Sequence, residues 1–87
     1  MKARIHVTFK AGVHDPQGKA IANALQGLGF SGIDAVRQGK YIEIDLAGSD
    51  RAAAERSVKD MCAKLLANPV IETYRIEIDS GAAEAVR

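Results

Sequence analysis

The sequence predicts an α+β fold of the ferredoxin-like type, with its elements in the order βαββαβ. Two observations lead to this prediction. Alternating apolar and polar residues mark short strands, and apolar residues spaced by three and four positions mark two helices between them. Right-handed crossovers then favour a four-stranded antiparallel sheet with both helices on one face.

The first strand lies near the start of the chain. Ile5, Val7 and Phe9 alternate with polar residues, as expected for a strand with one buried face. These polar residues are Arg4, His6, Thr8 and Lys10.

The first helix is expected from Pro16 to Leu28. Asp15 can cap its first N–H groups, and Pro16 stands where a missing N–H costs nothing. Gly29 suits the C-terminal stop, and we expect Phe30 to return the chain to the core. The apolar face of this helix, which we expect to pack on the sheet, consists of Ile21, Ala24, Leu25 and Leu28.

Two strands are expected next. The first, over residues 33–36, is the weaker prediction, because Gly32 and Asp34 oppose a strand. Residues 37–40 are interpreted as a hairpin turn in which Gly39 takes a positive φ. The strand after the turn points Ile42, Ile44 and Leu46 to one face and Tyr41, Glu43 and Asp45 to the other.

The second helix and the last strand complete the expected fold. Asp50 can cap the helix, and Asn68 followed by Pro69 ends it. The expected apolar stripe is Ala54, Val58, Met61, Cys62 and Leu65. The last strand alternates Tyr74, Ile76 and Ile78 with Thr73, Arg75, Glu77 and Asp79. We expect one domain over residues 1–79 and a flexible C-terminal tail over residues 80–87.

Composition limits the classes of function. A chain of 87 residues makes a small domain that buries about 60–65% of its unfolded surface, so self-association would add useful stability. Cys62 is the only cysteine, which suits a reducing compartment, and no segment resembles a signal peptide or a membrane span. The net charge of +1 provides no long-range field for nucleic acid or an anionic membrane. We therefore expect a cytoplasmic protein with neither nucleic-acid nor membrane partners.

The polar face of the expected sheet is one candidate interface. Tyr41 and Arg75 are its expected anchors, since these residue types recur at binding hot spots. The alternative is a solvated face whose mixed charges pair across the strands.

Two strand–helix junctions are further candidates for an interface. One consists of Asp15, Pro16, Gln17, Gly18 and Lys19, and the other includes Asn68 and Pro69. Gly18 is costly in the first turn of a helix, which indicates close approach of another backbone segment. Simple capping is the alternative for both junctions.

The residues do not predict catalysis, a cofactor or a metal site. Five residues, instead of the four of a phosphate-binding loop, separate Gly12 from Gly18 and Lys19. Cys62 lies on an apolar stripe, and His6 and His14 have no partner at zinc-ligand spacing. We expect the fold to serve as a platform for contacts.

The two junctions carry a resemblance to a known family. Asp15-Pro16-Gln17-Gly18-Lys19 and Leu65-Leu66-Ala67-Asn68-Pro69-Val70-Ile71-Glu72, together with Gly39-Lys40-Tyr41-Ile42-Glu43 and Met61-Cys62, follow one another at the spacing of the PurS family. The resemblance runs from about Lys2 to Asp79. PurS is the small subunit of phosphoribosylformylglycinamidine synthase.

The resemblance implies a non-catalytic subunit of a C–N ligase complex in purine biosynthesis. It implies a homodimer or tetramer that bridges a synthetase, PurL, and a glutaminase, PurQ, and assists the transfer of ammonia between them. ATP, magnesium and glutamine would be used by those partners and not by this chain.

Two other classes of function remain open from the residues. A stand-alone ligand-sensing domain of ferredoxin-like fold would bind a metabolite with the loops at its strand ends. An independent hydrolase would depend on Cys62 or on the exposed carboxylates, and it is the least favoured of the three.

Overall fold

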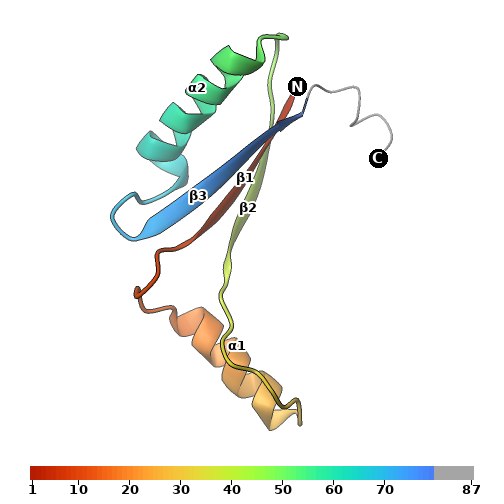
Figure 1. Cartoon of the computed structure of the whole chain (residues 1–87), viewed down its shortest axis with the longest axis vertical. Helices are drawn as coiled ribbons and strands as arrows, with labels where there is room; N and C mark the ends of the chain where they lie inside the picture. The colour runs from red at the N-terminus through yellow and green to blue at the C-terminus, as the bar shows by residue number, and fades with distance from the viewer. Residues whose placement is uncertain (80–87) are drawn as a thin grey trace.

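The computed structural model describes residues 1–79, which form three strands and two α-helices (Figure 1). In chain order the elements are β1 (Lys2–Phe9), α1 (Pro16–Gly27), β2 (Gly39–Asp45), α2 (Arg51–Met61), the π-helix η1 (Cys62–Leu66) and β3 (Glu72–Asp79). The predicted tail, residues 80–87, lies outside the described residues.

The three strands form one antiparallel sheet in the order β2-β1-β3. Ile5 on the central strand lies opposite Ile42 on β2 and Ile76 on β3. Because side chains alternate between faces along a strand, this register places apolar residues of all three strands on one face of the sheet. Polar residues occupy the other face.

The core lies between the apolar face and α2, which covers that face along its length (Figure 1). Ile5, Val58 and Cys62 are completely buried there. The coverage is uneven, since Ile42 and Ile44 on β2 are only half-buried. The single covering helix therefore protects β1 better than it protects β2.

The end of α2 departs from the predicted stripe. The chain continues into η1, where the N–H of Ala67 bonds to the carbonyl oxygen of Cys62 at 3.0 Å, five residues earlier. This wider turn contains one extra residue, so the side chain that faces the core shifts along the sequence by one position. Leu66 is half-buried and Leu65 is 81% exposed, so the prediction of Leu65 in the core is wrong.

The predicted four-stranded sheet is wrong, because the described residues contain three strands. Residues 30–38 form no strand, and the stretch interpreted as a hairpin turn runs directly into β2. Gly39 has no positive φ and belongs to β2 itself. A Cβ at this position would lie 2.3 Å from the carbonyl oxygen of Val7 on β1. The glycine is thus needed for close strand packing and not for a turn.

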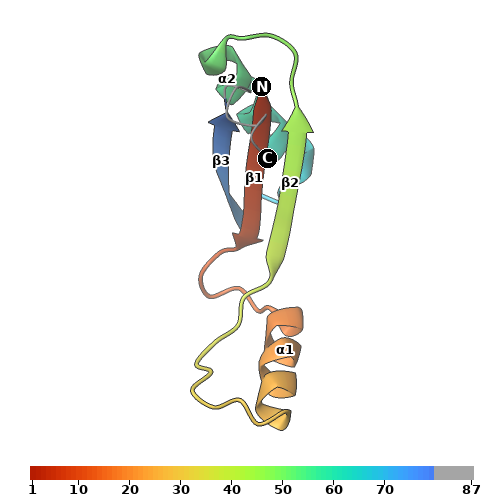
Figure 2. The same ribbon diagram turned by 90° about the vertical axis from the view of Figure 1, so that its right-hand side faces the viewer.

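The prediction that both helices cover one face of the sheet is also wrong. Without a turn before β2, the chain carries α1 and residues 28–38 beyond the end of the sheet (Figures 1 and 2). The molecule is consequently elongated and thin, with extents of 48 × 34 × 15 Å. Phe30, expected in the core, is 57% exposed.

The predicted starts of both helices and the predicted stop of α1 at Gly29 are confirmed. Gly29, two residues beyond the end of α1, has a φ of 95°. The N–H of Phe30 donates to the carbonyl of Leu25, and the N–H of Gly29 donates to that of Gln26. This is the Schellman arrangement. At the start of α2, the Asp50 carboxylate accepts a hydrogen bond from the N–H of Ala53 at 3.1 Å.

Candidate protein interface

Asp15 joins the start of α1 to the chain that enters β2. One carboxylate oxygen accepts a hydrogen bond from the N–H of Gly18 at 2.9 Å, and the other accepts one from the N–H of Gln38 at 3.0 Å. The bonds from Gln38 and then Gly18 lower the pKa of Asp15, because they favour its charged form. Asp15 therefore does more than cap a helix, since it links two segments that are 23 residues apart.

Gly18 is buried where these two segments cross. A Cβ on Gly18 would lie 2.4 Å from the carbonyl oxygen of Val36 and 2.6 Å from a carboxylate oxygen of Asp15. The expected close approach of another backbone segment is confirmed, and it explains a glycine in the first turn of a helix.

The Asn68 corner is a turn closed by its own hydrogen bonds. The Asn68 side chain accepts from the N–H of Val70 at 3.0 Å, and its backbone N–H donates to the Glu72 carboxylate at 2.7 Å. Its carbonyl oxygen accepts from the N–H groups of Ile71 and Glu72. Pro69 is exposed at the tip of this turn. The chain leaves η1 at Ala67, which is extended, so the helix ends before Asn68 and the Asn68 bonds close the turn that follows. The exposed tip of this turn is available for contact.

The two corners lie at the same end of the sheet. The N–H of Lys10 donates to the carbonyl of Ile71 at 2.8 Å, and the Lys40 ammonium donates to the carbonyl of Leu66 at 3.1 Å. Between them lies a pocket of about 240 Å³, which we call the corner pocket. It is lined by Val7, Thr8, Phe9, Gln17, Gln38, Gly39, Lys40 and Glu72. The Lys40 ammonium and the Glu72 carboxylate are engaged within the chain, whereas the side-chain amides of Gln17 and Gln38 can hydrogen-bond a protein surface.

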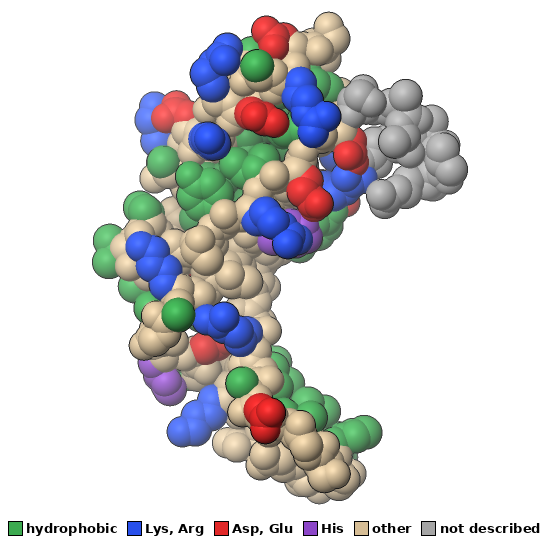
Figure 3. Space-filling view, viewed as in Figure 1, with side chains coloured by type: hydrophobic (Ala, Val, Ile, Leu, Met, Phe, Trp, Pro, Cys, Tyr) green, Lys and Arg blue, Asp and Glu red, His purple; other side chains and the backbone are tan. Residues whose placement is uncertain are grey.

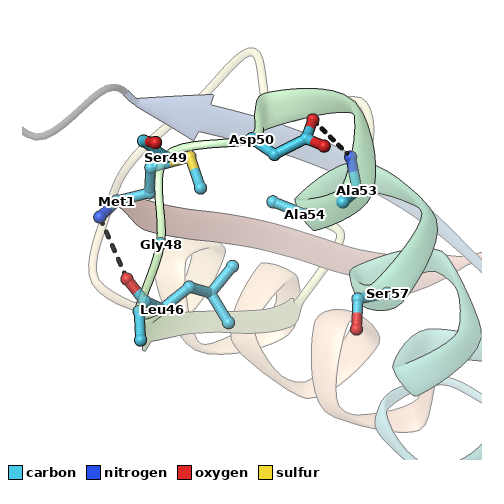
Figure 4. Close-up of a pocket in the computed structure, with 9 residues that line it drawn as sticks. Met1, Leu46, Gly48, Ser49, Asp50, Ala53, Ala54 and Ser57 are labelled. Atoms are coloured by element: carbon cyan, nitrogen blue, oxygen red, sulfur yellow. Dashed lines mark hydrogen bonds between the residues drawn. The ribbon is translucent and has the colours of Figure 1, made fainter.

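A second pocket, of about 250 Å³, lies at the opposite end of the sheet, beside the start of α2 (Figure 4). Two of its charged groups are engaged within the chain. The amino group of Met1 donates to the carbonyl of Leu46 at 3.1 Å, and Asp50 accepts from Ala53 (Figure 4). These bonds join the first strand to the loop before α2, so this pocket has a structural explanation.

The polar face of the sheet has a regular pattern of charge. β1 carries basic side chains, and both neighbouring strands place acidic side chains opposite them: Lys2 faces Asp45 and Asp79, and Arg4 faces Glu43 and Glu77. The Arg4 guanidinium pairs with Asp79, and Lys2 lies 3.5 Å from Glu43. The Lys2–Glu43 pair is partly exposed, so it contributes at most about 1 kcal/mol of stability, whereas Arg4 and Asp79 are both partly buried. The face is consequently polar but nearly balanced in charge.

The two expected anchors of this face lie in one row with a third residue. Tyr41 and Arg75 flank His6 on the two neighbouring strands. The ring centroids of His6 and Tyr41 are 5.0 Å apart, and His6 lies 3.1 Å from Glu77. The Tyr41 hydroxyl donates to Glu43 at 2.7 Å, which raises the pKa of Tyr41 and lowers that of Glu43.

Cys62 is the candidate nucleophile of the hydrolase alternative. Cys62 is completely buried, and burial raises the pKa of its thiol, so the reactive thiolate is disfavoured. Within residues 1–79, no three His, Cys, Asp or Glu side chains are grouped to hold a metal ion. No helix in that same part of the chain is long and apolar enough to cross a membrane.

The predicted interface residues thus fall into two neighbouring groups. The first is the pair of corners. The second is the row through Tyr41 and Arg75, and Tyr41 directly follows Lys40 of the corner pocket along β2. Sequence reasoning missed Gln38, Lys40 and His6, because each gains its place through contacts between distant segments. It also missed the exposure of Leu28. Gly29, the predicted helix stop directly after Leu28, was a usable signal.

Comparison with known proteins identifies close relatives. The family model described as PurS, phosphoribosylformylglycinamidine (FGAM) synthase, matches residues 2–80. PurS from a Synechocystis species is 49% identical over 75 residues, which cover 86% of this chain and 75% of the relative. PurS from Bacillus subtilis is 43% identical over 83 residues, or 95% of this chain and 98% of the relative.

Solved structures agree with this match. A crystal structure of B. subtilis PurS superimposes with a TM-score of 0.81 at 45% identity, covering 90% of this chain and 96% of that one. A chain in the structure of PurLQS from Thermotoga maritima gives a TM-score of 0.80 at 32% identity, covering 87% and 93%. These neighbours confirm the ferredoxin-like α+β class, while the sheet formed by residues 1–79 has three strands.

Proposed function

The chain belongs to the PurS family of FGAM synthase subunits, and we propose that it serves this enzyme as a non-catalytic subunit that holds the larger subunits together. The family match is the reason to prefer this function over a stand-alone ligand-sensing domain. The T. maritima relative occurs in an assembly named PurLQS. By analogy, the partners of this chain are a PurL-like synthetase and a PurQ-like glutaminase.

One observation carries the bridging role. Two junctions that are about 50 residues apart in sequence meet at one end of the sheet, around a pocket lined by Gln17, Lys40 and Glu72. Their backbones are held by internal hydrogen bonds, so this end offers a preorganised polar surface. A rigid surface loses little conformational freedom on binding, which favours a stable contact.

The division of chemistry follows from the same proposal. ATP, magnesium and glutamine are used by the synthetase and the glutaminase, and this chain binds none of them. Its part in ammonia transfer is to exclude bulk water where the two larger subunits meet, which requires shape and not reactive groups. The whole assembly works in the cytoplasm, with this chain present as a homodimer or tetramer.

Co-purification tests the proposal most simply. Tagged chain should retain both the synthetase and the glutaminase of its own cell, and glutamine-dependent activity should require it. Gln17→Ala, at the corner pocket, should weaken this assembly with the fold unchanged.

Gln26→Ala is the matched control, because Gln26 is an exposed glutamine of the same helix but lies far from the corner pocket. Equal assembly by both variants would remove Gln17 from the interface. Failure of the unmodified chain to retain either larger protein would end the bridging proposal.

A further inference from the structure

β3 is an edge strand of the sheet. The order β2-β1-β3 gives it one neighbouring strand within residues 1–79. An edge strand presents unpaired backbone N–H and C=O groups to any extended segment that approaches it. β3 is eight residues long, so its free edge can accept a further strand along several residues.

The register shows which residues face this free edge. The N–H of Lys10 donates to the carbonyl of Ile71, and these two residues continue the β1–β3 register by one position, so they are a hydrogen-bonded pair. Hydrogen-bonded and non-hydrogen-bonded pairs alternate along an antiparallel ladder, and Tyr74 and Ile76 fall in the second set. Their backbone N–H and C=O groups therefore point away from β1.

A groove lies beside the same two residues, between β3 and α2. Its volume is about 340 Å³. The side chains of Tyr74 and Ile76 are only half-buried, although they pack against the core. Figure 3 shows hydrophobic side chains exposed between α2 and β3, with Lys and Arg side chains on either side. The groove is lined by Glu55, Lys59, Tyr74, Arg75 and Ile76.

The charged residues of the groove leave two cations unpaired. Glu55 pairs with Arg51, one turn earlier in α2, at 3.7 Å. Lys59 and Arg75 make no ion pair within residues 1–79. Lys59 is exposed on α2, and Arg75 is exposed on the polar face of the sheet. A segment lying along β3 meets one cation on each face of the sheet, and carboxylates complement both.

We propose that the free edge of β3 binds an extended, acidic segment of a larger subunit, which adds to the sheet as a further strand. Alternate residues of that segment place apolar side chains in the groove against Tyr74 and Ile76. The residues between them place carboxylates beside Arg75. Backbone hydrogen bonds supply affinity in this mode of recognition, and the pockets for alternate side chains supply specificity. The inference rests on the proposed function, because the segment belongs to the synthetase or the glutaminase.

A single backbone methyl group tests the added strand. Cys62 is the only cysteine, so a synthetic segment 62–87 with an N-methyl group on Ile76 can be ligated there to a recombinant segment 1–61. The methyl group removes an outward N–H and blocks the edge. It leaves the β1–β3 bonds in place, because Ile76 is at a non-hydrogen-bonded position.

The measured quantity is the dissociation constant of the full-length chain for the two purified larger subunits. The methyl group should raise this constant by about tenfold or more, since it removes a hydrogen bond and adds a steric clash. The same ligated chain without the methyl group is the control. Circular dichroism would verify that both ligated chains fold alike.

Reversal of one charge tests the acidic character of the partner in a chain with an ordinary backbone. Lys59→Glu should raise the same dissociation constant by about three- to tenfold, with a smaller effect at high salt. Arg56→Glu is the matched control, because Arg56 is exposed on the same helix but does not line the groove. Its dissociation constant should stay within about twofold of that of the unmodified chain.

Cross-linking identifies the bound segment. A photoreactive amino acid in place of Glu55, at the groove, should label a stretch rich in Asp and Glu in one of the two larger subunits. A label found only on a second copy of this chain, or only on its own residues 80–87, would overturn the proposal.

The outcomes separate this inference from the proposed function. Equal binding with and without the methyl group on Ile76 would overturn the added strand and leave the bridging role intact. Equal affinities of Lys59→Glu and Arg56→Glu would overturn the acidic partner. An unmodified chain that binds neither larger subunit would end the bridging proposal, and this inference with it.

Discussion

α2 and α1 are both amphipathic helices, but only α2 finds its apolar partner within the described chain. The apolar residues of α2 contact β1 and β3, and Val58 is completely buried. Those of α1 lie beyond the sheet, and Leu28 is 74% exposed. The comparison shows that helical periodicity predicts a need for an apolar surface and does not predict which polypeptide supplies it.

Truncation of an apolar side chain should lower the free energy of unfolding far more beneath α2 than on α1. Ile5→Ala should lower the free energy of unfolding by about 2–5 kcal/mol, because it leaves a cavity beneath α2. Leu28→Ala should change it by no more than about 0.5 kcal/mol in dilute solution, because Leu28 is 74% exposed. Urea denaturation at low protein concentration measures both. A large cost for Leu28→Ala under these conditions would show that α1 is already packed against its own chain.

Two glycines of α1 should respond in opposite ways to alanine. Gly18→Ala should lower the free energy of unfolding by about 1–3 kcal/mol, since its Cβ would meet the carbonyl of Val36 at 2.4 Å. Gly27→Ala meets no atom within 4 Å and should raise it by up to about 1 kcal/mol. Thermal denaturation of the pair provides the check. Equal effects would contradict the close packing of Gly18 against the backbone of Val36.

The shift in register at η1 predicts a difference between adjacent leucines. Leu66→Ala should lower the free energy of unfolding by about 1–2 kcal/mol, because Leu66 packs against the core. Leu65→Ala should change it by no more than about 0.5 kcal/mol, because Leu65 is exposed. The reverse order in urea denaturation would mean that the helix continues without the wide turn.

The smallest expected effect is the titration of Asp15. Its pKa is lowered in the folded chain, so its contribution to stability is complete above the unfolded pKa and is lost as the pH falls through the folded pKa. Gln38→Pro removes the backbone N–H that lowers this pKa most. Carboxyl NMR titration should show the pKa of Asp15 rising toward its ordinary value in that variant. An unchanged pKa would show that Gln38 does not hold the carboxylate.

The starts of both helices and the end of α1 could be predicted from the sequence because their signals are local. Asp15, Gly29 and Asp50 satisfy hydrogen-bonding groups within a few residues of themselves. The predicted hairpin is wrong because glycine occurs both where φ is positive and where two backbone segments approach closely. Gly39 belongs to the second kind. Nothing near Gly39 in sequence reveals that Val7 will lie against it. The position of α1 beyond the end of the sheet depends in the same way on long-range contacts.

The candidate interface was predicted in part for the same reason. Both corners were found from their capping residues, and Gly18 was correctly assigned to a close backbone approach. Their meeting at one end of the sheet was not foreseen, because it depends on pairing between β1 and β3. Gln38 and Lys40 join the pocket only through that arrangement.

Hydrogen exchange of the isolated chain, measured over a range of protein concentrations, tests the central claim most directly. We expect the amides of β1 to be protected at every concentration and those of α1 to gain protection as the concentration rises. Full protection of α1 in the most dilute sample would contradict the account, because α1 would then be covered by its own chain.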